Sequence, residues 1–391
     1  MNVRRVITSP FAVGVVVLAL YGSWLAVARH HGHEAREFAV IGQEYIDKGS
    51  GSPAIEGLAA DAKPGTGYDG QFFLFIALDP TGAPEYIDDA GYRYGRIVYP
   101  LAARAIALGR QSVIPKVLIL LNVLAIAAGA VAIAGWLRRR GFSVWFALVF
   151  ALYPGVFVVV LRDLSEALAY SLVALAVVTF DSTSTRRLAA SSALFGIAVL
   201  TRETAALYAL IWAGALLLER RDLKANWRRT AAFCAGAFAP YVGYRLFLLS
   251  WLDATGVPRR LLPTAVPFGG IAEWWPWDVD SIQQVYAVVL PGLLCLVLAA
   301  WALVRGAVDA AVVALGANAL LYVVLLPEPS FDDFYASLRI STSVVLALLL
   351  AAPTLQRTLG STRTWLWVPV VAWFTPWWML LPTAFSPTYG W

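Results

Sequence analysis

The segment "TGYDGQFFLFIALDP", at positions 66–80, places one carboxylate just ahead of an aromatic run. Gly67 and Gly70 flank Tyr68 and Asp69, and glycine lets a backbone turn tightly and approach a ligand closely. A carboxylate presented in such a turn can act as a general base that removes the proton of a hydroxyl group. Aspartate before glycine is also a common turn residue that bonds to its own backbone, so the motif alone leaves this structural interpretation open.

Further charged residues stand at the ends of apolar segments. In "LRDLSEALAY", Arg162 and Asp163 precede Glu166 by four and three residues, so we expect all three on one helix face. The others are Arg202, Glu203, Arg259, Arg260, Asp332, Asp333 and Arg339. Ionisable residues near membrane depth are costly, and they usually face a cavity or one another.

The composition indicates which elements position these residues. Hydrophobic residues make up 60% of the 391-residue chain and charged residues only 14%, whereas a soluble domain has about 25% charged residues. Continuous apolar runs of about 20 residues recur, and each could cross the bilayer as a helix. The sequence therefore predicts an all-α, polytopic membrane protein, built as a single transmembrane domain over residues 1–391.

We expect about eleven spans. They lie near 6–28, 115–137, 141–160, 163–180, 187–201, 203–219, 227–250, 282–304, 308–326, 337–356 and 363–382. Pro154 and Gly155 interrupt the third span, and the fifth is short, so both are candidates for bent helices.

Arginine and lysine near the span ends indicate the orientation. With a cytoplasmic N-terminus, the inner loops hold the basic residues Arg138–Arg140, Arg186, Arg187, Arg220, Arg221, Lys224, Arg228, Arg229, Arg305, Arg357 and Arg363. The odd number of spans then places the C-terminus outside the cytoplasm. Residues 29–113 form one long extracytoplasmic loop, in which 34–49, 71–78 and 96–109 are predicted interfacial or re-entrant helices.

This orientation puts the charged span ends and the Asp69 loop on the same outer side. Arg93 and Arg96 lie in that loop as well. We therefore expect these residues to converge on one outward-facing site. The alternative is that pairs such as Arg162–Glu166 and Arg202–Glu203 only join helices, and for any single pair this alternative stays open.

The sequence assigns no certain cofactor. His30, His31 and His33 are the only histidines, and their spacing matches no standard zinc site, although a divalent metal ion stays open as a cofactor. The net charge of +5 comes from basic residues dispersed over short loops, which does not indicate a nucleic-acid partner.

The long first loop with its "YDGQ" motif, together with about eleven spans, resembles the GT-C superfamily of membrane glycosyltransferases. In that superfamily an aspartate or an acidic pair in the first extracytoplasmic loop lies at the active site, and the donor is a sugar on a polyprenyl phosphate or pyrophosphate. A single aspartate followed by Gly70 is similar to bacterial polyprenyl-phosphate-mannose-dependent mannosyltransferases, and differs from the paired Asp-Glu of protein mannosyltransferases.

The resemblance implies a hexosyl- or pentosyltransferase of the cell envelope, with Asp69 as general base and Tyr68 and Gln71 near the sugar. The donor is then a polyprenyl-phosphate sugar, the acceptor a glycan or glycolipid, and membrane lipids surround both. The phosphate leaving group needs cationic donors, for which the candidates are Arg96, Arg162, Arg202 and Arg339. Asp163, Glu166 and Glu203 are expected beside them.

Two other functions stay open. A lipid or small-molecule transporter or flippase would use charges near the bilayer midplane and broken helices. A non-catalytic membrane scaffold would not need a cluster of arginines and acids at one face. A path from Asp69 to the cytoplasmic side would favour transport, and a sealed surface at Asp69 would favour a scaffold.

Overall fold

The computed structural model describes residues 9–219, 223–252, 262–264, 266–272, 278–331 and 333–384. The fold is all-helical, with 78% of the chain in helices and no strand in the described ranges. Arg259, Arg260 and Asp332, which the sequence places in outer loops, lie outside these ranges. So do both chain ends, on whose positions the predicted topology depends.

The first half of the chain contains one long helix, a set of short helices and a second long helix. The elements are α2 (Pro10–His30), η1 (Ala35–Ala39), α3 (Gln43–Lys48), α4 (Pro53–Glu56), η2 (Ala59–Asp61), α5 (Gly70–Leu78), η3 (Ala83–Tyr86), α6 (Ala90–Tyr94), α7 (Val98–Ile106), α8 (Ile114–Arg139), η4 (Val144–Ala147), α9 (Leu148–Ala151), α10 (Pro154–Leu161), α11 (Glu166–Thr179) and α12 (Thr185–Thr201).

The second half is built mainly of apolar helices. The elements are η5 (Glu203–Ala205), α13 (Ala206–Leu218), α14 (Leu223–Leu252), α15 (Gly269–Ala272), α16 (Val279–Gln284), η7 (Val285–Val289), α17 (Leu290–Val304), α18 (Ala310–Ala319), η8 (Leu320–Leu325), η9 (Glu328–Ser330), α19 (Phe334–Ile340), α20 (Thr342–Leu359), η10 (Gly360–Leu366), α21 (Trp367–Phe374) and α22 (Trp377–Ala384).

Within the described ranges, five helices are long and apolar enough to cross a membrane. They are Pro10–His30, Ile114–Arg139, Asn226–Leu252, Ser281–Val304 and Phe334–Leu359. Val144–Ala151 and Pro154–Leu161 form a sixth span if counted together, and they meet at 48°, so the bend expected at Pro154 is confirmed. These helices agree with an integral membrane protein. The finer prediction of eleven spans requires that shorter apolar helices of 10–17 residues also cross the membrane, such as Glu166–Thr179 and Ala310–Leu325.

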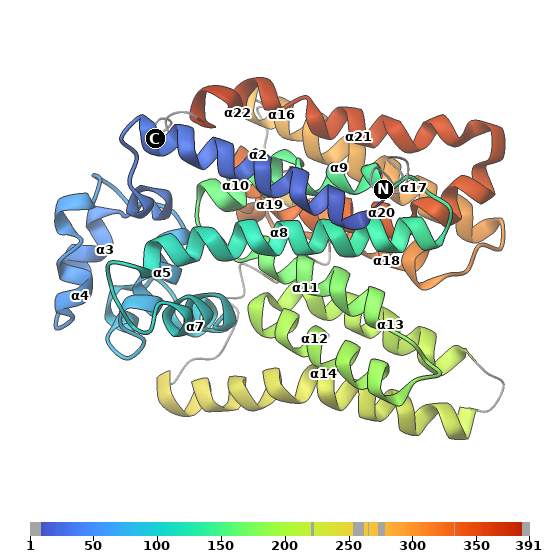
Figure 1. Cartoon of the computed structure of the whole chain (residues 1–391), viewed down its shortest axis with the longest axis horizontal. Coiled ribbons are helices and arrows are strands. Elements are labelled where there is room, and N and C mark those ends of the chain that lie inside the picture. The colour runs from blue at the N-terminus through green and yellow to red at the C-terminus, as the bar shows by residue number, and fades with distance from the viewer. Residues whose placement is uncertain are drawn as a thin grey trace, which may run out of the picture.

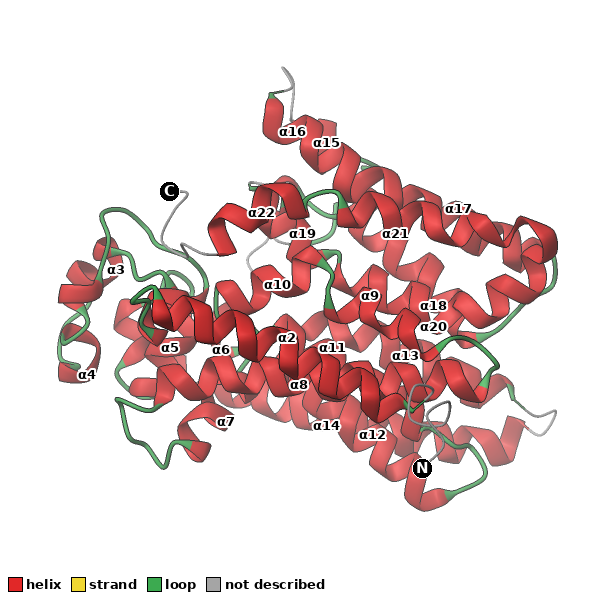
Figure 2. Cartoon of the chain, turned by 45° about the horizontal axis from the view of Figure 1, so that its top comes forward, coloured by secondary structure: helices red, strands yellow, loops and turns green. Residues whose placement is uncertain are grey.

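The helices pack lengthwise into a bundle (Figure 1). α8 packs against both α2 and α11, and α14 covers α12 and α13. The segment Phe334–Leu359 forms the centre of the bundle, and 94% of the residues in its 18-residue apolar stretch are buried. There the Trp136 indole nitrogen donates a 2.9 Å hydrogen bond to the Leu350 carbonyl oxygen. Figure 2 shows the described chain as helices joined by loops, with no strand drawn.

The short helices of the long first loop gather at one end of this bundle, where α3, α4, α5 and α7 lie together (Figure 1). The structure corrects two expectations here. α5 is buried along its whole length rather than interfacial, because its Phe and Leu side chains pack into the main core. The predicted amphipathic helix over 34–49 is split into η1 and α3 by Val40, which adopts a left-handed backbone with φ +50°.

A third correction concerns the turn between α10 and α11. α10 ends at Leu161 and α11 starts at Glu166, and Asp163 between them has φ +56°. A left-handed residue reverses the direction of the chain locally, so the expected single helix face for Arg162, Asp163 and Glu166 is wrong. Their side chains instead point to different neighbours.

Candidate functional site at the loop end of the bundle

Asp69 stands at the N-cap of α5 but does not cap it. One carboxylate oxygen lies 2.9 Å from an Arg93 guanidinium nitrogen, and the other accepts a 2.5 Å hydrogen bond from Arg339. The interpretation of Asp69 as a turn residue bonded to its own backbone therefore does not hold.

The two glycines beside Asp69 have the roles that the motif predicts. Gly67 adopts φ +65°, which favours glycine. At Gly70 an added Cβ atom would collide with the carbonyl oxygen of Arg162, so the loop that carries Asp69 packs directly on the turn between α10 and α11. Close backbone contact at this point fixes the position of the carboxylate.

Arg93, which the sequence marks only as a charged loop residue, is a central member of the site. Its Nε and Nη2 atoms donate to the two oxygens of Asp88 at 2.9 and 2.7 Å, while its Nη1 atom faces Asp69. Asp89 caps α6 by accepting the Tyr92 N–H at 2.9 Å. A cap followed by an arginine one turn later, in "DDAGYRYGR", is the signal that could have identified Arg93.

Arg339 joins Asp69 to a buried carboxylate from α11. Its Nη1 atom donates to Glu166 Oε1 at 3.2 Å, and the same oxygen lies 2.9 Å from Arg202 Nη1. The Glu166 side chain is fully buried, so it holds both arginines from beneath the site rather than facing a ligand. The sequence left open a pair between Arg162 and Glu166 that only joins helices. In the structure Glu166 pairs with Arg202 and Arg339 instead.

Arg96 forms a separate two-point ion pair. Its Nε and Nη2 atoms donate to Glu203 at 3.0 and 2.6 Å, and Nη2 also bonds the Tyr92 hydroxyl. Glu203 therefore pairs with the loop residue Arg96 instead of with its sequence neighbour Arg202. This pair ties the loop to the start of η5, across 107 positions of the chain.

These residues surround a cavity of about 760 Å³. Six of the residues that the sequence selected line it, namely Tyr68, Asp69, Gln71, Arg96, Arg202 and Arg339. Arg93 and Asp333, which the sequence included among the charged residues expected to converge here, line it too. The sequence reasoning left out several other lining residues, namely Tyr45, Phe72, Asp88, Asp89, Tyr92 and Glu328. Four selected residues are not among the lining residues, namely Arg162, Asp163, Glu166 and Glu203.

Gln71 and Tyr68 shape the wall of the cavity. The Gln71 side chain accepts from the Gly42 N–H at 2.9 Å and donates to the Thr66 carbonyl oxygen at 2.7 Å. These two bonds hold the loop in its turn. The Tyr68 ring lies 5.3 Å from the Arg339 guanidinium carbon and 5.9 Å from that of Arg162, within the range of cation–π attraction.

Asp163 belongs to a different, fully buried network. Its Oδ1 atom accepts a 2.9 Å hydrogen bond from the Tyr99 hydroxyl, which in turn accepts from the Asn122 side chain at 2.8 Å. Asn122 also donates to the Leu164 carbonyl oxygen at 2.9 Å. The network fixes the left-handed turn on which Gly70 rests, so Asp163 supports the position of Asp69 without reaching the cavity.

The electrostatic state of Asp69 follows from these contacts. Burial by itself raises the pKa of the carboxyl group, but the Coulomb attraction of Arg93 and Arg339 outweighs burial and holds the pKa well below its usual range. Asp69 is therefore ionised in the structure as it stands.

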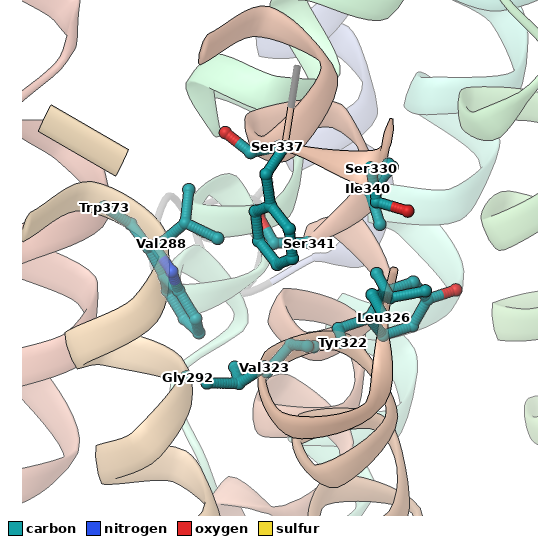
Figure 3. A pocket seen from close by; sticks show the side chains of 12 residues that line it. Val288, Gly292, Tyr322, Val323, Leu326, Ser330, Ser337, Ile340, Ser341 and Trp373 are labelled. Atoms are coloured by element: carbon teal, nitrogen blue, oxygen red, sulfur yellow. The ribbon is translucent and has the colours of Figure 1, made fainter. Parts of the chain in front are cut away.

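A small void lies behind the cavity, beyond Ser330 and Ile340, which line both. Figure 3 shows the side chains around it, among them Val288, Tyr322 and Trp373. Its volume of about 10 Å³ has room for about one water molecule, so it does not extend the cavity as a channel in this direction.

The described residues contain no group of three or more histidine, cysteine, aspartate or glutamate side chains arranged to hold a metal ion. The His33 ring instead pairs with Glu37 at 2.9 Å. Comparison of the chain with protein-family models, with curated proteins and with solved structures gives no match.

Proposed function

We propose that the chain is a membrane glycosyltransferase of the GT-C type. It moves a hexosyl or pentosyl group from a polyprenyl-phosphate donor to a lipid-linked or cell-envelope acceptor on the extracytoplasmic face. The observation that carries the proposal is one cavity of about 760 Å³ in which Asp69 faces Arg93, Arg96, Arg202 and Arg339. A carboxylate beside several guanidinium groups suits a reaction that needs a base and an anionic leaving group.

The proposed reaction has one displacement step. The acceptor hydroxyl oxygen attacks the anomeric carbon of the sugar, and the bond from that carbon to the phosphate oxygen breaks. The phosphate leaves with the bonding electron pair, and Asp69 takes the hydroxyl proton. Arginine forks match phosphate geometry, so the arginines that line the cavity are proposed to stabilise the charge on the leaving phosphate, namely Arg93, Arg96, Arg202 and Arg339.

The size and place of the cavity agree with this substrate. Ligand sites usually measure about 300–1,000 Å³, which accommodates a sugar and its phosphate. Tyr45, Phe72 and Tyr92 offer ring faces for a sugar, among the charged groups that line the cavity. The long lipid tail of the donor would stay between apolar helices, in contact with the surrounding membrane lipids.

The proposal includes the eleven-span topology with a cytoplasmic N-terminus. In that topology the loop over 29–113 faces away from the cytoplasm and forms the acceptor side of the site. Arg162, which is fully buried between the Tyr68 and Tyr335 rings, would act on the donor only through Tyr68.

The test is sugar transfer by purified Asp69→Asn protein, measured with a polyprenyl-phosphate sugar and a membrane acceptor. The variant keeps the shape of the side chain but cannot take up the proton, and loss of a general base typically slows a reaction by about 100- to 10,000-fold. Donor binding should persist, since the arginines remain.

A matched control is Asp61→Asn, which removes a loop carboxylate that pairs with Arg36 at 3.0 Å outside the cavity. Transfer by the control should equal that of the unmodified chain. Near-normal transfer by Asp69→Asn would remove Asp69 as the base. Lipid movement between vesicle leaflets without any sugar transfer by the unmodified chain would favour a flippase.

A further inference from the structure

The charged groups of the site are balanced in pairs. The ion pairs match the arginines Arg93, Arg96, Arg202 and Arg339 with the carboxylates Asp69, Asp88, Glu166 and Glu203. Asp89, Glu328 and Asp333 add further carboxylates to the cavity wall. An anionic ligand therefore meets no excess of positive charge, and it can be held only if it takes an arginine from a carboxylate.

Asp69 is the carboxylate that is easiest to replace. Asp88 and Glu203 each bind one arginine through two nitrogen atoms, and Glu166 is fully buried. Asp69 pairs with Arg93 and with Arg339 through a single nitrogen each, and its side chain is 22% exposed to the cavity. A phosphate group offers more oxygens than a carboxylate does, so it can bond to the same two guanidinium groups and accept further charge-assisted hydrogen bonds.

We propose that the phosphate group of a lipid-linked donor takes Arg93 and Arg339 from Asp69, and that this exchange frees the Asp69 carboxylate to accept the proton of the acceptor. The inference rests on the proposed function and assigns Arg93 and Arg339 as the phosphate site. It also explains how a carboxylate held by two arginines becomes a base only when a donor is present.

The exchange alters the charges that Asp69 experiences. While Arg93 and Arg339 hold it, the Asp69 pKa is far below the range useful for a general base. Once the phosphate takes both arginines, the carboxylate loses its counter-ions and gains an anionic neighbour, and both changes raise its pKa. The other charged or titratable groups that face Asp69 are Arg96, Tyr45, Tyr68, Asp88 and Asp333. Asp88 and Asp333 are carboxylates, so their negative charge raises the Asp69 pKa, as that of the phosphate does.

The first test compares the affinities of full-length variants for a polyprenyl methyl phosphodiester, which carries the donor's phosphate charge without its sugar. Asp69→Asn removes the carboxylate that competes for both arginines, so it should bind this lipid on the order of tenfold more tightly than the unmodified chain. Arg93→Gln should bind at least about tenfold more weakly. Asp61→Asn should bind as the unmodified chain does, because Asp61 does not line the cavity.

Equal or weaker binding by Asp69→Asn would overturn the exchange, because it would mean that Asp69 organises the arginines for the ligand. Unchanged binding by Arg93→Gln would overturn the assignment of the phosphate site. If Asp69→Asn binds the lipid more tightly but the unmodified chain transfers no sugar, the exchange is supported and the proposed function is refuted. Sugar transfer by the unmodified chain with weaker binding by Asp69→Asn would do the reverse.

The second test needs no variant. Calorimetry of phosphodiester binding at about pH 5, in two buffers with different ionisation heats, measures the protons taken up on binding. A carboxylate whose pKa moves from far below this pH toward or above it takes up part of a proton, whereas the phosphodiester itself does not titrate there. Binding with no proton uptake would contradict the exchange even if Asp69→Asn failed to accumulate.

Discussion

Glu166 is a fully buried carboxylate whose Oε1 atom contacts both Arg202 and Arg339. Removing one partner of a buried ion pair leaves an uncompensated charge, which costs about 3–5 kcal/mol of folding free energy. We therefore expect Glu166→Gln to lower the thermal stability of the detergent-solubilised protein markedly, together with sugar transfer. The position of Glu166 beneath the cavity gives it a structural role in orienting Arg339 toward Asp69.

The control for this prediction is Arg187→Gln, which breaks an ion pair with Asp181 in which the Arg187 side chain is 52% exposed. Exposed ion pairs contribute little, so the melting temperature should change little. A Glu166→Gln variant as stable as the control would show that the buried pairs do not hold α11 to α19.

At the scale of elements, the short helix α5 positions the proposed base because its first residue rests on the turn between α10 and α11. An added methyl group at Gly70 would collide with the Arg162 carbonyl oxygen. Overpacking of this kind costs about 1–3 kcal/mol, and the strain would displace Asp69 as well. Gly70→Ala should therefore lower both the melting temperature and the rate of sugar transfer.

Gly22→Ala in α2 provides the matched control, because no atom lies within 4 Å of the position that its Cβ would take. Alanine is a better helix former than glycine, so stability should stay the same or rise. Normal transfer by Gly70→Ala would show that the loop tolerates a shift of α5, and that close packing at this glycine does not position the base.

At the scale of the whole molecule, the short loop helices lie at one end of the bundle (Figure 1), and the proposed topology puts that end outside the cytoplasm. Ala60 and Arg139 are exposed residues in the long loop and at the end of α8, respectively. In a background without Cys234 and Cys295, a membrane-impermeant maleimide should label Ala60→Cys in intact cells. It should label Arg139→Cys only after the membrane is permeabilised.

The opposite labelling pattern would place the cavity on the cytoplasmic side, and donor and acceptor would then have to be sought there. Labelling of both positions in intact cells would indicate leaky cells, which a cytoplasmic marker protein detects. The positive-inside distribution of Arg138–Arg140 is the reason to expect the first pattern.

The sequence by itself determined the all-helical, membrane-spanning class, the bend at Pro154 and the tight turn around Asp69. Each of these features depends on residues within one turn or one span, because hydrophobicity, proline and glycine act on the backbone locally. The glycine spacing around Asp69 also marked the residue that faces the cavity. Arg202 and Arg339 line the cavity too, because charged groups at span ends turn away from lipid.

Only the tertiary structure decided which charges pair. Asp69 and Arg339 are 270 positions apart, and Glu166 meets Arg202 and Arg339 rather than Arg162 because the left-handed turn at Asp163 redirects the chain. The sequence placed Arg93 on the same side as Asp69, but only the fold shows that the two side chains form an ion pair. Burial of α5 likewise depends on the helices that cover it. Ion-pair partners and burial are properties of packing between distant segments, which spacing along one chain does not specify.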